Sequence, residues 1–378
     1  MNRRMVFAAG LGGTGLVAVG GIWRVTRMPD GAFEPWVAAG NEVQDVRLDA
    51  FRHAILAPNP HNRQPWLIEL VGQDEAIVSC DLEKRLPVTD PFDRQITIGF
   101  GAFLEVARIA AAQRGIAIEV DLFPQGEAQP RLDRTPVARL RFGGQEIANP
   151  DPLFDAIVHR RSNKEAYDTA RVVEPALLDD ILKSGGEGTA QSARIGPIKD
   201  EILSSINAEL ATRDAYMESV DLMRIGHEEV AANPDGIDLT GPMIEAGIVT
   251  GQISREQLAD MQSNAYKIGV EQTNETHGSV PSLIWIKTPS NTRADQIEAG
   301  RQYVRANLRA TQLGLSMHPM SQSLQEYSEV ADSCRAVHEL LGASGEERIQ
   351  MLARVGYGPR TGPSPRWPIV TFVIPQTS

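Results

Sequence analysis

The feature that most constrains the fold is a long apolar helix that stops at a glycine, because this pattern occurs in both halves of the chain. Residues 98–114 carry apolar side chains at helical spacing and end at Gly115, and residues 296–313 end in the same way at Gly314. A glycine is the usual residue after the last helical turn, since it adopts a left-handed backbone without strain. Each glycine leads into an apolar stretch, so the order of elements repeats. A repeated order predicts two similar units fused as a pseudo-dimer within one chain.

The segments around these helices alternate between strand-like and helix-like patterns, which predicts an α+β fold. A chain of 378 residues is long enough for two compact units. We expect the first unit over residues 40–147 and the second over 148–378. The expected helices are 47–56, 98–114, 152–159, 174–183 and 296–313, and the expected strands are 66–70, 76–80, 116–123, 136–142 and 282–288.

One segment of the second half, residues 201–276, has no counterpart in the first. It is rich in charged and helix-forming residues and contains the turn 233–236, Asn-Pro-Asp-Gly. An insertion of this length usually covers a site or packs on a partner. We expect helical hairpins that form a lid.

Charge and cysteine content narrow the possible functions. The net charge of −12, with no basic run interleaved with aromatic residues, argues against nucleic acid as a partner. Cys80 and Cys334 lie far apart and outside any metal-ligand spacing, so the sequence favours two buried free thiols over a pair. The seven histidines are scattered, and the sequence predicts no metal site.

Residues 1–30 have the pattern of a signal or anchor segment rather than of a folded domain. Arg3 and Arg4, with Phe7 after them, precede the uncharged, glycine-rich stretch 5–23. This arrangement resembles a twin-arginine export signal, with Asn2 where a serine or threonine is usual. No clean cleavage site follows. We therefore expect an exported, periplasmic protein or a membrane-tethered one, with the cytoplasm as the alternative.

Three polar clusters are candidates for a ligand site. The first, Arg160 to Lys164, places two guanidiniums, a hydroxyl and an ammonium within five residues, and guanidinium forks match phosphate oxygens. The second is the loop 58–66, rich in amide side chains that carry both donors and acceptors. The third comprises residues 319–322 and 354–366. Each cluster alone is more often surface charge or an ordinary loop.

In this order, the three clusters resemble the nitroreductase superfamily, and specifically its Acg family of duplicated members, over roughly residues 45–375. The resemblance implies one bound FMN per chain. It implies that the Arg-Arg-Ser-Asn-Lys motif holds the phosphate, that its last residue faces the flavin pyrimidine, and that the loop ending in Asn-Arg-Gln-Pro-Trp reaches the flavin from the opposite unit. That loop departs from the family in having Asn59 and Pro60 where serines are common. The implied cofactor-binding residues are Arg160, Arg161, Ser162, Lys164, Asn59, Asn62, Gln64, Pro319, Met320, Ser321 and Arg366.

The same resemblance implies a flavin oxidoreductase that passes two electrons to a small-molecule acceptor of the nitro, quinone or enone class. No protein nucleophile is required, since the cofactor carries the chemistry. The alternative is a flavin-binding or sequestering protein whose lid excludes NAD(P)H, and a tethered interaction protein with a vestigial fold is a third. Only the second half carries the Arg-Arg-Ser motif, so one composite site in a monomeric chain is expected.

Overall fold

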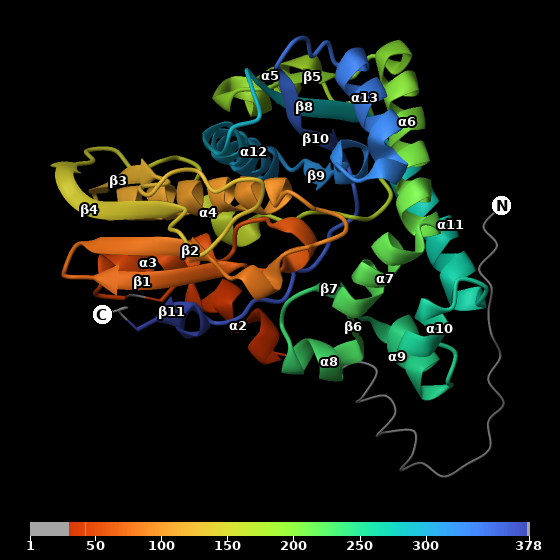
Figure 1. The fold of residues 1–378 in the computed structure, drawn as a ribbon, viewed down its shortest axis with the longest axis horizontal. Coiled ribbons are helices and arrows are strands. Elements are labelled where there is room, and N and C mark those ends of the chain that lie inside the picture. The colour runs from red at the N-terminus through yellow and green to blue at the C-terminus, as the bar shows by residue number, and fades with distance from the viewer. Residues whose placement is uncertain (1–29, 42, 376–378) are drawn as a thin grey trace.

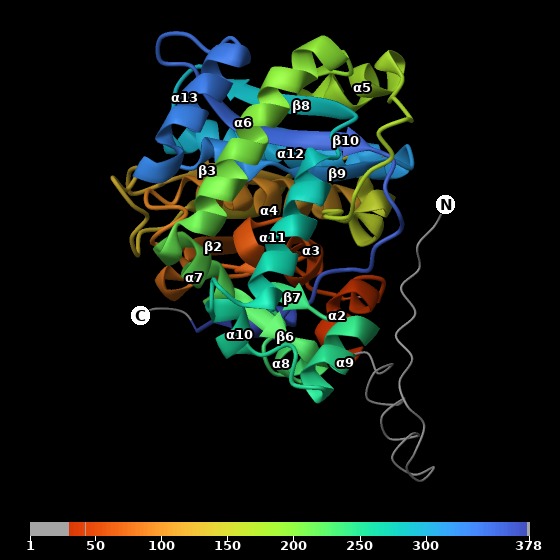
Figure 2. The ribbon, with the colours of Figure 1, turned by 90° about the vertical axis from the view of Figure 1, so that its right-hand side faces the viewer.

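The computed structural model describes residues 30–41 and 43–375, so the predicted signal segment lies outside the described residues except for Asp30. Two sheets lie on opposite sides of a pair of long helices. A mostly helical insertion runs along one side of both sheets (Figures 1 and 2). The predicted α+β class is confirmed.

The two sheets follow the same plan. Apart from β11 (Val373–Ile374), which pairs in parallel with β1 at the edge, the first sheet has the order β1-β2-β4-β3 and the second the order β5-β8-β10-β9, with every neighbouring pair antiparallel in both. In each sheet the long helix connects the second strand of the order to the edge strand. The strands are β1 Trp66–Val71, β2 Glu75–Cys80, β3 Ile116–Leu122, β4 Ala138–Glu146, β5 Glu187–Thr189, β8 Ser282–Thr288, β9 Ser316–Pro319 and β10 Arg348–Gly356. The two sheets therefore share one order of strands and one position for their long helix.

The long helices α4 (Arg94–Gln113) and α12 (Arg293–Gln312) pack against each other at a pair of glycines. A Cβ atom added to Gly101 would lie 2.0 Å from the carbonyl oxygen of Ile297, and one added to Gly300 would lie 1.9 Å from that of Ile98. The two glycines occupy the same position in their helices, so the contact is reciprocal. Only glycine allows the two backbones to approach this closely.

The first residue of each long helix is a buried arginine that reaches into the other unit. Arg94 donates to the carbonyl oxygen of Gln350 at 3.0 Å, and Arg293 donates to that of Pro130 at 3.0 Å. Both side chains are 1% exposed. Hydrogen bonds from a buried charge are costly to break, so this exchange fixes how the two units sit together.

Shorter helices complete the units. They are α2 Asp30–Ala38, α3 Val46–Ala54, α5 Pro175–Ile181 and α13 Ala331–Leu340, with 3₁₀ turns η1 Pro60–Asn62, η2 Leu82–Lys84, η3 Phe154–His159, η4 Leu182–Ser184, η5 Ser321–Leu324, η6 Ser328–Val330 and η7 Ile369–Thr371. The helix predicted over residues 152–159 is thus a 3₁₀ segment. It begins at Phe154 and ends where Arg160 takes an extended conformation.

The helical insertion spans residues 192–278 and begins earlier than the predicted 201. Its first helix is continuous from Ser192, and Ile195 and Ile198 pack into the core of the second unit. It also contains a short parallel strand pair that the sequence did not predict. Its elements are α6 Ser192–Ala211, α7 Arg213–Leu222, β6 Met223–Ile225, α8 Gly226–Ala232, β7 Ile237–Leu239, α9 Pro242–Val249, α10 Arg255–Ala259 and α11 Asn264–Gly278.

The end of the chain belongs with the first unit, which corrects the expected boundary of 148–378 for the second. Strand β11 (Val373–Ile374) pairs in parallel with β1, and Phe372 and Trp367 pack in the first core. The edge of β1 has backbone groups that need partners, and the returning strand supplies them.

We expect Gly300→Ala to lower the free energy of unfolding by about 1–3 kcal/mol, because the methyl group would overlap the backbone of α4. Chemical denaturation measures the change. Gly269→Ala is the matched control, since no atom lies within 4 Å of the added Cβ in helix α11. Equal effects of the two substitutions would contradict the close helix contact.

Candidate functional site

A cavity of about 380 Å³ lies where the two units and the helical insertion meet. This volume is within the range of small-molecule sites. Eight of the residues predicted to bind a cofactor line it: Asn59, Asn62, Arg160, Ser162, Lys164, Pro319, Ser321 and Arg366. The first unit contributes the loop 58–62 and Gln95, and the rest comes from the helical insertion and the second unit. The structure therefore brings the three sequence clusters together in one composite site.

One end of the cavity is a cluster of arginines around a single aromatic ring. The guanidinium carbons of Arg160, Arg161 and Arg366 lie 5.9, 4.6 and 5.4 Å from the ring centre of Trp36 on α2. Within the described part of the chain, no aspartate or glutamate forms an ion pair with any of the three. Such a concentration of cations requires an anion.

Two of these arginines are buried, so their charges have lost the hydration that would otherwise stabilise them. Arg160 is 3% exposed and Arg366 is 2% exposed. Loss of hydration lowers the pKa of Arg160 to about 10, and the same loss, together with repulsion from Arg160, lowers the pKa of Arg366 to about 9. Both groups nevertheless remain protonated at neutral pH. A bound dianion would restore the favourable interactions that burial removes.

Helix α3 supplies partial compensation for these charges. Arg366 donates to the carbonyl oxygens of Ile55 at 2.9 Å and Ala57 at 3.3 Å, and Arg160 donates to that of Leu56 at 3.1 Å. These carbonyls follow the C-terminal end of the helix, where the helix dipole is negative. The carbonyls hold the guanidiniums in place, but they do not neutralise them.

The loop from the first unit is held in an unusual backbone conformation. His61, Asn62 and Gln64 have φ angles of 46°, 52° and 51°, in the left-handed region that non-glycine residues rarely occupy. The side chain of Asn59 accepts a hydrogen bond from the backbone of Gln64 at 2.8 Å, and Asn62 donates to the carbonyl of Pro365 at 2.9 Å. The two asparagines thus fix a strained loop at the cavity wall.

Three of the predicted site residues, Arg161, Met320 and Gln64, are not among the residues that line the cavity. Arg161 donates to the carbonyl oxygens of Val158 and Arg160 and lies over Trp36. Met320 is 1% exposed and packs in the second core.

Gln64 is the third predicted site residue outside the lining, and its side chain holds chain segments together. Its amide donates to the carbonyl of Pro234 in the insertion at 2.8 Å, and its oxygen accepts from the backbone of Trp367 at 3.0 Å. It joins three segments instead of facing a ligand.

Carboxylates of the insertion bind it to the first unit. Glu218 accepts from the backbone of Val88 and Thr89 at 2.9 and 3.0 Å. Asp235, 2% exposed, accepts from Lys84 at 2.6 Å and from Arg224 at 2.6 Å. These bonds join the insertion to the first unit, and twelve of its residues line the cavity.

Three histidines line the cavity: His61, which lies in the predicted loop 58–66 but was given no role there, and His277 and His318, which sequence reasoning missed. Burial, with repulsion from Lys164, lowers the pKa of His61 and His277 to about 4, and the pKa of His318 lies well below its ordinary value for the same reasons. All three rings are therefore neutral at physiological pH. No sequence signal links them, because they lie on unrelated segments.

Glu209, on α6 of the insertion, is a further missed residue. It lines the cavity, is 5% exposed, and its Oε2 atom has no hydrogen-bond partner in the described structure. Burial raises its pKa to about 7. A buried acid with this pKa is partly protonated near neutral pH and faces a ligand as either donor or acceptor.

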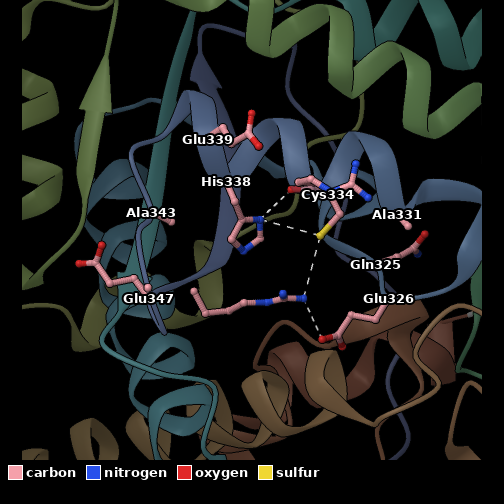
Figure 3. Close-up of a pocket in the computed structure, with 11 residues that line it drawn as sticks. Gln325, Glu326, Ala331, Cys334, His338, Glu339, Ala343 and Glu347 are labelled. Atoms are coloured by element: carbon pink, nitrogen blue, oxygen red, sulfur yellow. Dashed lines mark hydrogen bonds and ion pairs between the residues drawn. The ribbon is translucent and has the colours of Figure 1, made fainter.

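A second cavity, of about 520 Å³, lies beside α13 and β10 and contains Cys334 and His338 (Figure 3). His338 donates from Nδ1 to the carbonyl of Cys334 at 2.7 Å and accepts at Nε2 from the backbone of Ile349 at 3.1 Å. Because both ring nitrogens are occupied, His338 cannot act as a base for the thiol. Burial also raises the pKa of Cys334. The prediction of two free, buried thiols is confirmed for Cys80 and Cys334.

The chain is similar along most of its length to mycobacterial proteins. No family model matches it. It is 24% identical over 318 residues to the Mycobacterium tuberculosis protein provisionally named NAD(P)H nitroreductase acg, covering 83% of this chain and 90% of that protein. It is 26% identical over 310 residues to a second protein of that species with the same provisional activity, covering 81% and 83%. These similarities support the nitroreductase superfamily.

Solved structures also give matches, at low identity. A nitroreductase-like structure from Anabaena variabilis matches with a TM-score of 0.42 and 11% identity, covering 87% of this chain and 91% of that one. A Bacteroides fragilis nitroreductase with bound FMN matches with a TM-score of 0.32 and 12% identity, covering 56% and 90%.

We expect Asp235→Asn to loosen the insertion, because it weakens the ion pairs with Lys84 and Arg224. Limited proteolysis should cleave the insertion several-fold faster in this variant. Asp332→Asn is the control, since that exposed carboxylate pairs only with Arg335 of its own helix. Identical cleavage rates would contradict the assigned contact.

In the wild type, the ion pairs of Asp235 with Lys84 and Arg224 should also persist in mild acid. Burial alone would raise the pKa of Asp235, but hydrogen bonds from Lys84 and Arg224 outweigh burial and hold its pKa below 3.8. A carboxyl with a lowered folded-state pKa contributes stability that is present above its unfolded pKa and lost as the pH falls through the folded value. Cleavage at pH 5 should therefore match that at pH 7. Release of the insertion at pH 5 would contradict this assignment.

Proposed function

We propose that the chain binds one FMN in the composite cavity and acts as a flavin oxidoreductase of the nitroreductase superfamily. The observation that carries this proposal is the buried arginine cluster, in which none of the three guanidiniums forms an ion pair with a described carboxylate, although Asp238 in the cavity wall acts electrostatically on Arg366. A phosphate monoester supplies two negative charges and oxygens that guanidinium forks bind in pairs. Arg160 and Arg366 would hold the phosphate of FMN, with Ser162 beside them.

The remaining cavity residues fit the rest of a flavin. Lys164 lines the cavity and has no hydrogen bond or ion pair with the described residues. Its ammonium would favour negative charge on a ring system placed beside it. Pro319 and Ser321, which follow β9, would form the wall along the ring. When bound, FMN supplies two-electron transfer, and the chain's own residues bind it, orient it and exclude water.

The repeated fold explains why one FMN per chain is expected. In the first unit, the region that corresponds by order contains Arg52, whose guanidinium pairs with Asp49 at 2.5 Å and donates to the carbonyl of Ala38. That arginine already has a carboxylate partner, so it is not available to an anion. The complete site combines both units within one chain, as in a pseudo-dimer, and a monomer suffices for it.

A second function is favoured by the closed insertion, which acts here as a lid. Glu218 and Asp235 fix it to the first unit, and its residues line the cavity. A lid that stays closed would retain FMN and exclude NAD(P)H, giving a flavin-binding or sequestering protein. A lid that opens would admit an electron donor and then an acceptor of the nitro, quinone or enone class.

We further propose that residues 1–30, which resemble a twin-arginine signal, direct export or tether the chain to a membrane. These residues lie outside the described structure except for Asp30. Cell fractionation of the full chain and of an Arg3→Lys, Arg4→Lys variant tests this proposal. A wild-type chain that stays in the cytoplasm would contradict it.

The cofactor proposal predicts that the purified chain takes up FMN and becomes yellow. Arg160→Ala and the milder Arg366→Lys should each weaken FMN binding by about 100-fold or more, because each removes charge-assisted hydrogen bonds to phosphate. Arg171→Ala is the control, since that guanidinium lies over the ring of Tyr357 outside the cavity. A folded wild-type chain that binds no FMN would contradict the proposal.

Anaerobic reduction then separates the two functions. If the lid opens, NADH or NADPH should bleach the bound flavin, and Asp235→Asn should accelerate the bleaching. If the lid stays closed in the wild type, dithionite alone should reduce the flavin. Reduction by nicotinamides at the same rate in the wild type and in Asp235→Asn would show that the lid does not control access.

A further inference from the structure

Two histidines from different elements lie together at the wall of the composite cavity. His318 lies on β9 of the second unit, and His277 lies in the last turn of α11 of the insertion. Their ring centres are 5.5 Å apart with an angle of 70° between the planes, and the side chains are 9% and 8% exposed. Both line the cavity. The pair therefore exists only when the insertion packs on the second unit.

The hydrogen bonds of the two rings assign them opposite tautomers. Nδ1 of His277 lies 2.9 Å from the carbonyl oxygen of Thr273, and a carbonyl only accepts, so Nδ1 carries the proton. Nδ1 of His318 lies 3.2 Å from the guanidinium of Arg354, and a guanidinium only donates, so Nδ1 carries the lone pair. For neutral rings, Nε2 of His277 is then an acceptor and Nε2 of His318 a donor.

The surroundings keep both rings neutral. Burial, followed by repulsion from Arg354 and Lys164, lowers the pKa of His277. Burial also lowers the pKa of His318, and His277, Arg354 and Lys164 lower it further. The described residues that face the pair present no carboxylate that pairs with either ring. One N–H and one lone pair are thus fixed features of the wall.

Arg354 positions both members of the pair. Its side chain is 0% exposed, donates to the carbonyl oxygens of Glu165 at 2.8 Å and Ser279 at 3.2 Å, and lies 4.0 Å from the ring centre of Tyr167. It also donates to the carbonyl of Thr276, beside His277. One arginine therefore fixes the end of α11 and the tautomer of His318 together.

Neither Nε2 atom has a hydrogen-bond partner among the described residues. A donor and an acceptor on rings whose centres lie 5.5 Å apart in a cavity wall suit a ligand edge that carries the complementary acceptor and donor.

We propose that His277 and His318 form a subsite for a planar imide or amide edge, with His318 donating to its C=O group and His277 accepting from its N–H group. The inference rests on the proposed function, because the pyrimidine edge of a flavin is an imide and Lys164 lies in the same part of the cavity. A second source of the same chemistry is an amide or imide on a small molecule bound beside the cofactor.

The test compares FMN with 3-methyl-FMN, in which the N–H of the imide is blocked. The wild-type chain should bind FMN about 10-fold more tightly, and His277→Phe should bind the two flavins equally, as measured by fluorescence titration. His338→Phe, in the other cavity, is the matched control and should keep the preference. Nitrogen-15 shifts of labelled histidine should independently show Nε2 unprotonated in His277 and protonated in His318.

The outcomes separate the two sources. If the wild type binds both flavins equally, the FMN-loaded chain is titrated with uracil, a free imide, and binding that His277→Phe abolishes assigns the subsite to the second ligand. Equal flavin affinities with no uracil binding would overturn the subsite and leave FMN binding intact. A chain that binds no flavin would overturn both proposals, and matching tautomers in the two rings would overturn the subsite alone.

Discussion

The close contact of α4 and α12 at Gly101 and Gly300 determines the rest of the architecture. Each glycine lets the partner's backbone approach where any side chain would overlap it, and the contact is the same in both directions. The two units are therefore held in a fixed relation, which Arg94 and Arg293 reinforce, because each donates a hydrogen bond to the other unit. The composite cavity is a consequence, since its walls come from both units and from the insertion that spans them.

The charges of the buried arginines then favour an anionic ligand in the cavity. The protein buries Arg160 and Arg366 beside Trp36, and neither forms an ion pair with a described carboxylate, although Asp238 acts electrostatically on Arg366 and Arg52 of the first unit pairs with Asp49. An unpaired buried charge is costly, and such a cost is usually offset by a ligand. The insertion is bonded to the first unit through Glu218, and its His277 lies beside His318 in the cavity wall.

The sequence predicts the elements whose signal is local. Strands with alternating or continuous apolar patterns, such as 66–71 and 282–288, and the glycine-ended helices are found close to their predicted bounds. Most of the motif residues line one cavity, but a motif does not tell which way a side chain points, and Gln64 and Met320 lie outside the lining. The return of residues 367–374 to the first sheet and the pairing of His277 with His318 depend on tertiary contacts, and no local pattern encodes them.

The central claim is that the arginine cluster holds the phosphate of a flavin. Calorimetric titration of the full chain with FMN and with riboflavin tests it directly, since the two ligands share the ring system and differ in the phosphate. The account predicts that FMN binds at least about 100-fold more tightly, which corresponds to roughly 2.7 kcal/mol of charge-assisted hydrogen bonding. Equal affinities for the two ligands would contradict it.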